Sequence, residues 1–169
     1  MQMLRVTSLA LFLVAGCTYS SDIPQLEGRV NDYAGVLSVQ ERADLESTLA
    51  KYQDETTHQV AVLTVSSLHG ETIEEFSLRV ANAWKLGRKG LDNGVLITLA
   101  PNEREARIEL GRGINRFVSD STAKAILSET MIPAFRAGHF SEGLRLGVDR
   151  LLKECRAYQA NAEAGSSGV

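Results

Sequence analysis

The sequence predicts an α/β protein, a three-layer α/β/α sandwich around a mixed, mostly parallel sheet of about four strands with one antiparallel hairpin. Two continuous apolar runs, at residues 60–65 and 94–100, are typical of strands covered on both faces. A segment with helical periodicity lies between them, so the three segments form a βαβ unit with parallel strands. The alternating segment 106–110 then predicts an antiparallel strand near an edge.

Helix boundaries follow from local capping signals. The segments 38–41 and 72–75 are both capping boxes, in which a hydroxyl residue is followed three positions later by glutamate. The second of these helices is expected to end at Leu86, with Gly87 as the residue after its cap. A third helix is predicted from Asp120 to about Phe135, with Pro133 disturbing its end. A fourth carries apolar residues at helical spacing, namely Leu144, Val148, Leu151, Leu152 and Cys155.

The hairpin has an expected register. If residues 101–105 form its turn, Val95 lies opposite Gly111 and Ile97 lies opposite Glu109. The segment 92–94 then lies beside the segment 111–115, and Asp120 follows within a few residues. Carboxylate and amide side chains therefore meet at one end of the sheet, and such oxygen ligands suit Ca²⁺ or Mg²⁺. The alternative is that the glycines only form turns, Asp120 only caps a helix, and Glu109 only pairs with Arg107 or Arg112.

The N-terminus indicates export. Arg5 precedes a short apolar run at 9–14, and residues 14–17 read Val-Ala-Gly-Cys, which resembles the lipobox of bacterial lipoproteins. We therefore expect a signal peptide at 1–16, a lipid on Cys17, a tether at 17–25, a domain at 26–157 and a flexible tail at 158–169. Thr18 favours a periplasmic location at the outer membrane. The alternative is a plain secretory signal followed by a coincidental cysteine.

Charge and cysteine content exclude other classes of protein. The formal net charge is −3, and no cluster of Lys and Arg is visible along the sequence, so a nucleic-acid partner is not expected. Acylation of Cys17 leaves Cys155 without a partner for an internal disulfide. Because Cys155 lies on the apolar stripe of a predicted helix, we expect a buried, inert thiol.

Several motifs together resemble the TPM domain family over roughly residues 26–153. The resemblance rests on the segments 30–38 (VNDYAGVLS), 84–87 (WKLG), 92–96 (DNGVL), 107–113 (RIELGRG), 132–136 (IPAFR) and 138–143 (GHFSEG). It implies an α/β/α sandwich and an acidic site that binds Ca²⁺ in some members. The positions that match are Asp32, Asp92, Asn93, Glu109 and Asp120. Asn115 stands where the family usually has glutamate, which removes one formal charge from the site.

Two functions are compatible with these observations. The first is a lipid-anchored binding or maintenance module for envelope proteins, in which Ca²⁺ tightens the loops around Asp92 and Gly111. The second is a metal-dependent acid phosphatase, in which Ca²⁺ or Mg²⁺ activates water and Arg112 binds the phosphate. The sequence shows no obvious nucleophile, and this favours the first function.

Overall fold

The computed structural model describes residues 23–166, and it confirms the α/β sandwich. A four-stranded sheet has the order β1-β2-β3-β4, in which β1, β2 and β3 are parallel and β4 is antiparallel to β3. The strands are β1 (Val30–Asp32), β2 (Gln59–Thr64), β3 (Gly94–Ala100) and β4 (Glu105–Leu110). The expected signal peptide, most of the tether and Cys17 lie outside the described residues.

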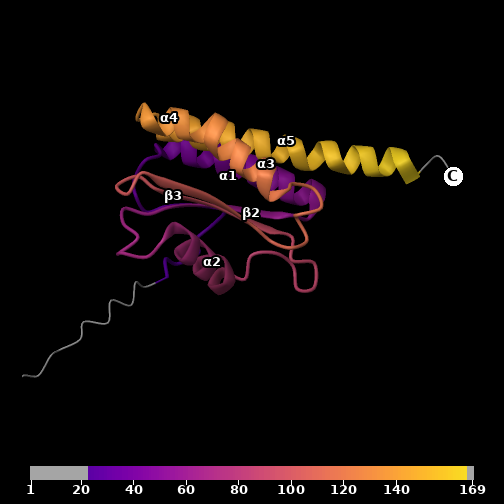
Figure 1. Ribbon diagram of the computed structural model, residues 1–169, viewed down its shortest axis with the longest axis horizontal. Coiled ribbons are helices and arrows are strands. Elements are labelled where there is room, and N and C mark those ends of the chain that lie inside the picture. Colours follow the sequence, from indigo (N-terminus) through magenta and orange to yellow (C-terminus); the bar gives the residue numbers. More distant parts are fainter. Residues whose placement is uncertain (1–22, 167–169) are drawn as a thin grey trace, which may run out of the picture.

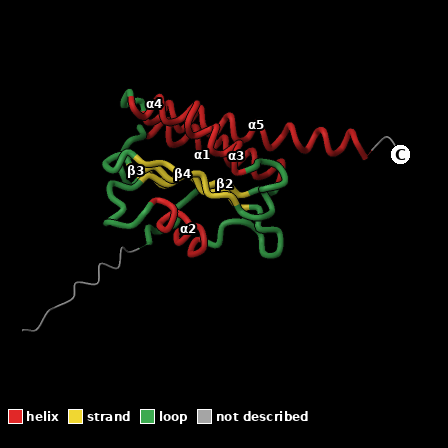
Figure 2. Tube along the Cα trace, in the orientation of Figure 1, coloured by secondary structure: helices red, strands yellow, loops and turns green. Residues whose placement is uncertain are grey.

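Helices cover both faces of the sheet (Figures 1 and 2). One face carries α1 (Val39–Thr56) and α5 (Phe140–Ser166) together with the segment 120–136, and α2 (Ile73–Trp84) covers the other. The crossovers from β1 to β2 and from β2 to β3 step in the same direction along the sheet, yet α1 and α2 lie on opposite faces. One of the two crossovers must therefore be left-handed, which is rare in parallel sheets.

The predicted capping boxes are confirmed, and one predicted helix end is wrong. Ser38 and Thr72 each accept a hydrogen bond from the backbone three residues ahead, and the glutamates at those positions return it. Helix α2, however, ends at Trp84 with Lys85 in a left-handed conformation at its cap (φ 51°). Gly87 lies beyond the helix at φ 95°, where an added Cβ would be 2.7 Å from the backbone nitrogen of Gly94.

The hairpin register also differs from the prediction. The connecting turn contains four residues, 101–104, so Val95 pairs with Leu110 and Ile97 pairs with Ile108. The expected register would have placed the carboxylate of Glu109 beside the buried Ile97. The observed one lets Ile108 join the core on the α1 and α5 face, while Glu109 lies on the α2 face beside Leu96.

The predicted helix from Asp120 is interrupted by a π-helical turn. It consists of α3 (Asp120–Ala125), the π-helical segment η1 (Ile126–Met131) and α4 (Ile132–Arg136). Pro133 has no backbone N–H, and the wider turn directly before it shifts the hydrogen-bond register by one residue. Helix α5 continues to Ser166 and so extends into the segment 158–169, for which the composition predicts a flexible tail.

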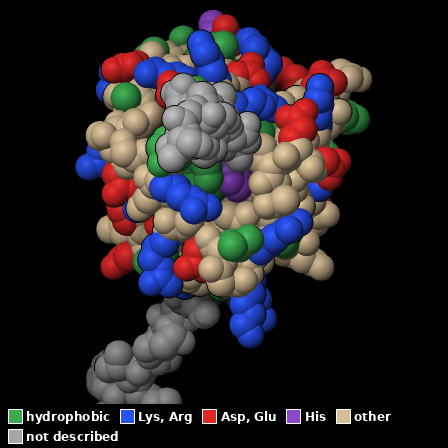
Figure 3. All heavy atoms as spheres, turned by 90° about the vertical axis from the view of Figure 1, so that its right-hand side faces the viewer, with side chains coloured by type: hydrophobic (Ala, Val, Ile, Leu, Met, Phe, Trp, Pro, Cys, Tyr) green, Lys and Arg blue, Asp and Glu red, His purple; other side chains and the backbone are tan. Residues whose placement is uncertain are grey.

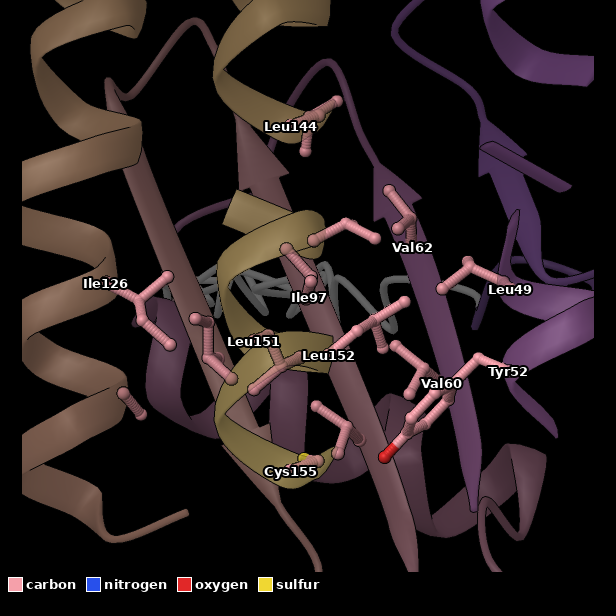
Figure 4. Close-up of a cluster of buried hydrophobic side chains, with 14 of the residues drawn as sticks. Leu49, Tyr52, Val60, Val62, Ile97, Ile126, Leu144, Leu151, Leu152 and Cys155 are labelled. Carbon is pink, nitrogen blue, oxygen red and sulfur yellow. The ribbon is translucent and has the colours of Figure 1, made fainter. Parts of the chain in front are cut away.

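The main core lies between the sheet and helices α1 and α5 (Figure 4). Cys155 is buried there as predicted, and burial raises the pKa of its thiol. The Tyr52 hydroxyl lies 2.8 Å from Nδ1 of the buried His58.

No helix within residues 23–166 is long and apolar enough to span a membrane.

Helix α5 packs closely against η1 because Gly147 has no side chain. An added Cβ on Gly147 would lie 2.4 Å from Sδ of Met131, which is itself fully buried. We therefore expect Gly147→Ala to lower the free energy of unfolding by about 1–3 kcal/mol through overpacking. Chemical denaturation measures this, with Lys153→Ala on the exposed side of α5 as the neutral control.

A double variant separates overpacking from other effects. Met131→Ala alone should cost about 2–5 kcal/mol because it leaves a cavity. The double variant should lose less free energy of unfolding than the sum of the two single losses, because the new methyl group occupies part of that cavity. Strictly additive costs would contradict the direct contact.

Candidate functional site

The candidate site begins where two loops approach each other at the end of the β3–β4 ladder. The Gly111 N–H donates to the Gly94 carbonyl (2.8 Å), and the Gly113 N–H donates to the Asp92 carbonyl (3.0 Å). An added Cβ would lie 2.2 Å from the Asp92 carbonyl oxygen at Gly111, and 1.8 Å from the Leu91 carbonyl oxygen at Gly113. Only glycine permits this spacing, so the Gly-Arg-Gly sequence fixes the loop containing Asp92 against the end of β4.

Asp92 and Glu109 meet at one cavity, as the sequence predicted. This cavity, of about 380 Å³, lies between α2 and the end of β4. Asp92, Glu109 and Arg112 line it together with apolar residues of α2 and β3. We call it the Asp92 cavity.

A second cavity adjoins the first and shares Glu109 with it. It has a volume of about 490 Å³ at the free edge of β4, and Asn115, Asp120 and Lys124 line it. Ser119 rather than Asp120 caps α3, since its Oγ accepts the Thr122 N–H (3.2 Å). The exposed Asp120 carboxylate is therefore not used as a cap. We refer to the carboxylates of Asp92, Glu109 and Asp120 together as the acidic edge.

Two of these carboxylates already have cationic partners. Arg112 contacts Asp92 (3.1 Å), and Arg107 contacts Glu109 (2.7 Å). The Arg112 side chain is 91% exposed, so solvent screens that pair, whereas the Glu109 side chain is only 18% exposed. Figure 3 faces the end where the parallel strands begin, and it shows basic and acidic side chains interspersed there. The surface around the acidic edge therefore carries both positive and negative side chains.

The residues present fit the chemistry of a hard cation but do not enclose one. Carboxylate and amide oxygens are the ligands that Ca²⁺ and Mg²⁺ prefer, and Ca²⁺ needs about 6–8 of them at about 2.3–2.6 Å. Within residues 23–166, no group of three or more His, Cys, Asp and Glu side chains is arranged to hold a metal ion. An ion at the acidic edge would therefore keep several water ligands and would compete with Arg107 and Arg112.

Asn93 lies next to the acidic edge, but its side-chain amide is used in hydrogen bonds within the protein. Its side chain is buried, its Oδ1 accepts the Arg88 N–H (2.8 Å), and its Nδ2 donates to the Thr57 carbonyl (3.0 Å). The amide thus ties the loop after α2 to the end of α1. Ligation through Oδ1 would compete with the bond from Arg88.

Asp32 lies at the opposite end of the sheet. It ends β1, whereas Asp92 precedes β3, and these two strands run in the same direction. Its carboxylate accepts hydrogen bonds from the backbone N–H groups of Val36 (3.1 Å) and Leu37 (2.9 Å) and from the Thr64 hydroxyl. The structure does not bring Asp32 to the other predicted ligands, and its contacts shape the turn before α1.

Sequence reasoning did not place Glu74 and Lys124 at the site. Both line the cavity around Asp120, and Glu74 of α2 lies 3.7 Å from Arg107. Glu74 lies within the capping-box segment 72–75, and Lys124 occupies an exposed helix position, so neither carries a local signal of function. They reach the cavity only because α2 and α3 pack on either side of β4.

Known proteins share the family and the fold of this chain. The TPM domain family model matches residues 30–154, and comparison with curated proteins gives no match. The solution structure of the N-terminal domain of a P. gingivalis protein is similar to this chain, with a TM-score of 0.70 and 31% identity over 74% of this chain and 80% of that one.

Two further solution structures share the fold at lower identity. BA42 from Bizionia argentinensis has a TM-score of 0.64 and 22% identity, covering 72% of this chain and 83% of its own. The N-terminal domain of cg2496 from Corynebacterium glutamicum has a TM-score of 0.58 and 18% identity, covering 80% and 82%. Since the family model spans most of the chain, the protein belongs to the TPM domain family.

Proposed function

We propose that this TPM-domain protein is a lipid-anchored binding module of the bacterial envelope, with the acidic edge as its binding site for Ca²⁺ and for an envelope protein. The observation that carries the proposal is that Asp92, Glu109 and Asp120 line two adjoining cavities joined by Glu109. In this proposal Cys17 carries the lipid and holds the domain at the periplasmic side of a membrane, with the outer membrane favoured by Thr18.

The charge balance indicates weak ion binding. Arg107 and Arg112 neutralise two of the three carboxylates, and Asn115 contributes an amide oxygen without charge. Fewer ligand charges and a less rigid site lower Ca²⁺ affinity, and extracellular modules bind with dissociation constants of about 10⁻⁴–10⁻³ M. We place the acidic edge in that range. A protein partner that supplies further oxygen ligands would complete the coordination.

Phosphatase activity is the second candidate function. It is favoured by Arg112, whose exposed guanidinium can donate two hydrogen bonds to a phosphate beside Asp92 and Glu109. The described residues that line the Asp92 cavity include no Ser, Thr, Cys or His, so a water molecule is the available nucleophile. In such a reaction water attacks phosphorus, the alcohol leaves, and a bound cation would offset charge on the phosphate.

Calcium binding predicts a shift in thermal stability. The chain from residue 17 onward with Cys17→Ser contains every described helix and strand and carries no lipid. At about 10 mM Ca²⁺, a site with a dissociation constant near 1 mM raises the free energy of unfolding by about 1.4 kcal/mol, which is a few degrees in Tm. Differential scanning calorimetry with Ca²⁺ or chelator measures this shift.

Four variants locate the ion. Glu109→Gln and Asp120→Asn should each reduce the shift, whereas Asp54→Asn on the exposed side of α1 should leave it unchanged. Asp32→Ala should lower the basal Tm, because two backbone N–H groups lose their acceptor, but it should keep the full calcium shift. A shift that survives Glu109→Gln and Asp120→Asn, or disappears in Asp32→Ala, is incompatible with the proposed site.

The phosphatase alternative is tested by a separate measurement of hydrolysis. Hydrolysis of an aryl phosphate by the same chain, with Ca²⁺, Mg²⁺ or chelator, should remain at the uncatalysed rate if the protein is a binding module. If the domain is a phosphatase, turnover should require the cation and should fall at least tenfold in Asp92→Ala and Arg112→Gln. Cation-dependent turnover with that sensitivity would replace our first proposal by the second.

A further inference from the structure

A second site of different character lies at the other end of the sheet. A cavity of about 680 Å³ lies between the β3–β4 turn and the turn that joins α4 to α5. This volume is within the range of about 300–1,000 Å³ that is typical of small-molecule sites. It lies where β3 ends, at the opposite end of β4 from the acidic edge, and shares Ala106 with the cavity around Asp120. The inference does not depend on the function proposed above.

The walls of this cavity are apolar. They are formed by side chains from β3, β4, α4 and α5, namely Leu99, Ala106, Ile132, Phe135 and Phe140. The two phenylalanine rings lie 6.0 Å apart between centroids and are tilted by 35°. An added Cβ on Gly143 would lie 2.5 Å from Cε1 of Phe135, so the close packing of α4 on α5 holds that ring in place.

All the charged side chains among its described lining residues are cationic. Arg104 comes from the β3–β4 turn and Arg136 from the end of α4, and both are exposed. Eight of the twelve described arginines form ion pairs with carboxylates, whereas these two do not. Two unpaired guanidinium groups beside an apolar cavity favour an anion with an apolar body.

The acidic residues close in sequence to these two arginines make their contacts with other groups. Glu103 accepts hydrogen bonds from the Ser67 hydroxyl (3.0 Å) and the Leu68 N–H (2.9 Å), and Glu142 contacts His139 (3.5 Å). Glu105 precedes Ala106 on β4, and because side chains alternate along a strand it lies on the opposite face from the cavity. These carboxylates do not neutralise the two arginines.

We infer that this cavity binds a single-chain anionic amphiphile, with a carboxylate or phosphate head between Arg104 and Arg136 and a hydrocarbon tail against the two phenylalanines. The backbone at its entrance is unusual, since Arg104 adopts a left-handed conformation (φ 60°) that is uncommon for a residue other than glycine. This conformation sets the direction in which the Arg104 side chain leaves the turn.

Calorimetric titration of the Cys17→Ser chain with dodecanoate, below the concentration at which it forms micelles, tests the inference. We expect binding of one molecule per chain, and about tenfold weaker binding in each of Arg104→Gln and Arg136→Gln, since each loses a charge-assisted hydrogen bond. Arg145→Gln, an exposed residue of α5 that pairs with Asp149, is the matched control and should bind dodecanoate like the unmodified chain. Decyl phosphate should also bind.

Three comparisons can overturn the inference. Absence of dodecanoate binding would refute it outright. Dodecanol binding as tightly as dodecanoate would show that the arginines do not recognise the head group. Inorganic phosphate binding as tightly as decyl phosphate would show a site for small anions, in which the apolar walls have no part. Amide chemical shifts should move at 99–106 and 132–143 rather than at 109–120, which separates this site from the acidic edge.

Discussion

The close approach of two backbone segments is the constraint on which the acidic edge depends. The carbonyl oxygens of Leu91 and Asp92 lie so near Gly111 and Gly113 that no Cβ fits between them. This contact extends the β3–β4 pairing beyond the strands and brings Asp92 to the cavity that Glu109 lines. The chain then turns through the buried Ile114 and Val118, and these anchor the start of α3 so that Asp120 reaches the same edge.

The balance of charge at this edge is our reason for proposing binding rather than turnover. Metal-assisted hydrolysis needs a cation held by several free carboxylates, but here Arg107 and Arg112 already pair with two of the three. The same arrangement suits a surface that is completed by a partner, because an added ligand can displace a partly exposed guanidinium at low cost. The two ends of the sheet also differ in chemistry, with carboxylates at one end and unpaired arginines with phenylalanine at the other.

Most of the fold could be predicted because its signals are local. Capping boxes at Ser38 and Thr72 and two apolar strands are properties of short segments, and the βαβ unit follows from them. The hairpin register depends on a turn length that the sequence does not specify by itself, and the core decides it by burying Ile108. The three-residue β1 and the opposite hands of the two crossovers depend on packing between distant segments. The sequence carries no local signal for either feature.

The same distinction applies to the candidate site. Glu109 lies on the hairpin, Asp92 directly precedes it, and Asp120 follows it at the start of α3, so closeness in sequence indicates their closeness in space. Family resemblance predicts Asp32 at the site, but Asp32 ends a parallel strand at the far end of the sheet, where Val36, Leu37 and Thr64 donate hydrogen bonds to its oxygens. Asn93 is beside the site, but Arg88 and Thr57 occupy its amide.

A calcium titration of the ¹⁵N-labelled chain, followed by amide chemical shifts, tests the proposed binding site most directly. Saturable changes with a millimolar midpoint should appear at residues 91–94 and 109–120 and should be absent at 32–37. Changes confined to the Asp32 turn, or an unchanged spectrum at saturating calcium, would contradict the proposal that the hairpin and its glycine-fixed loops form the binding site.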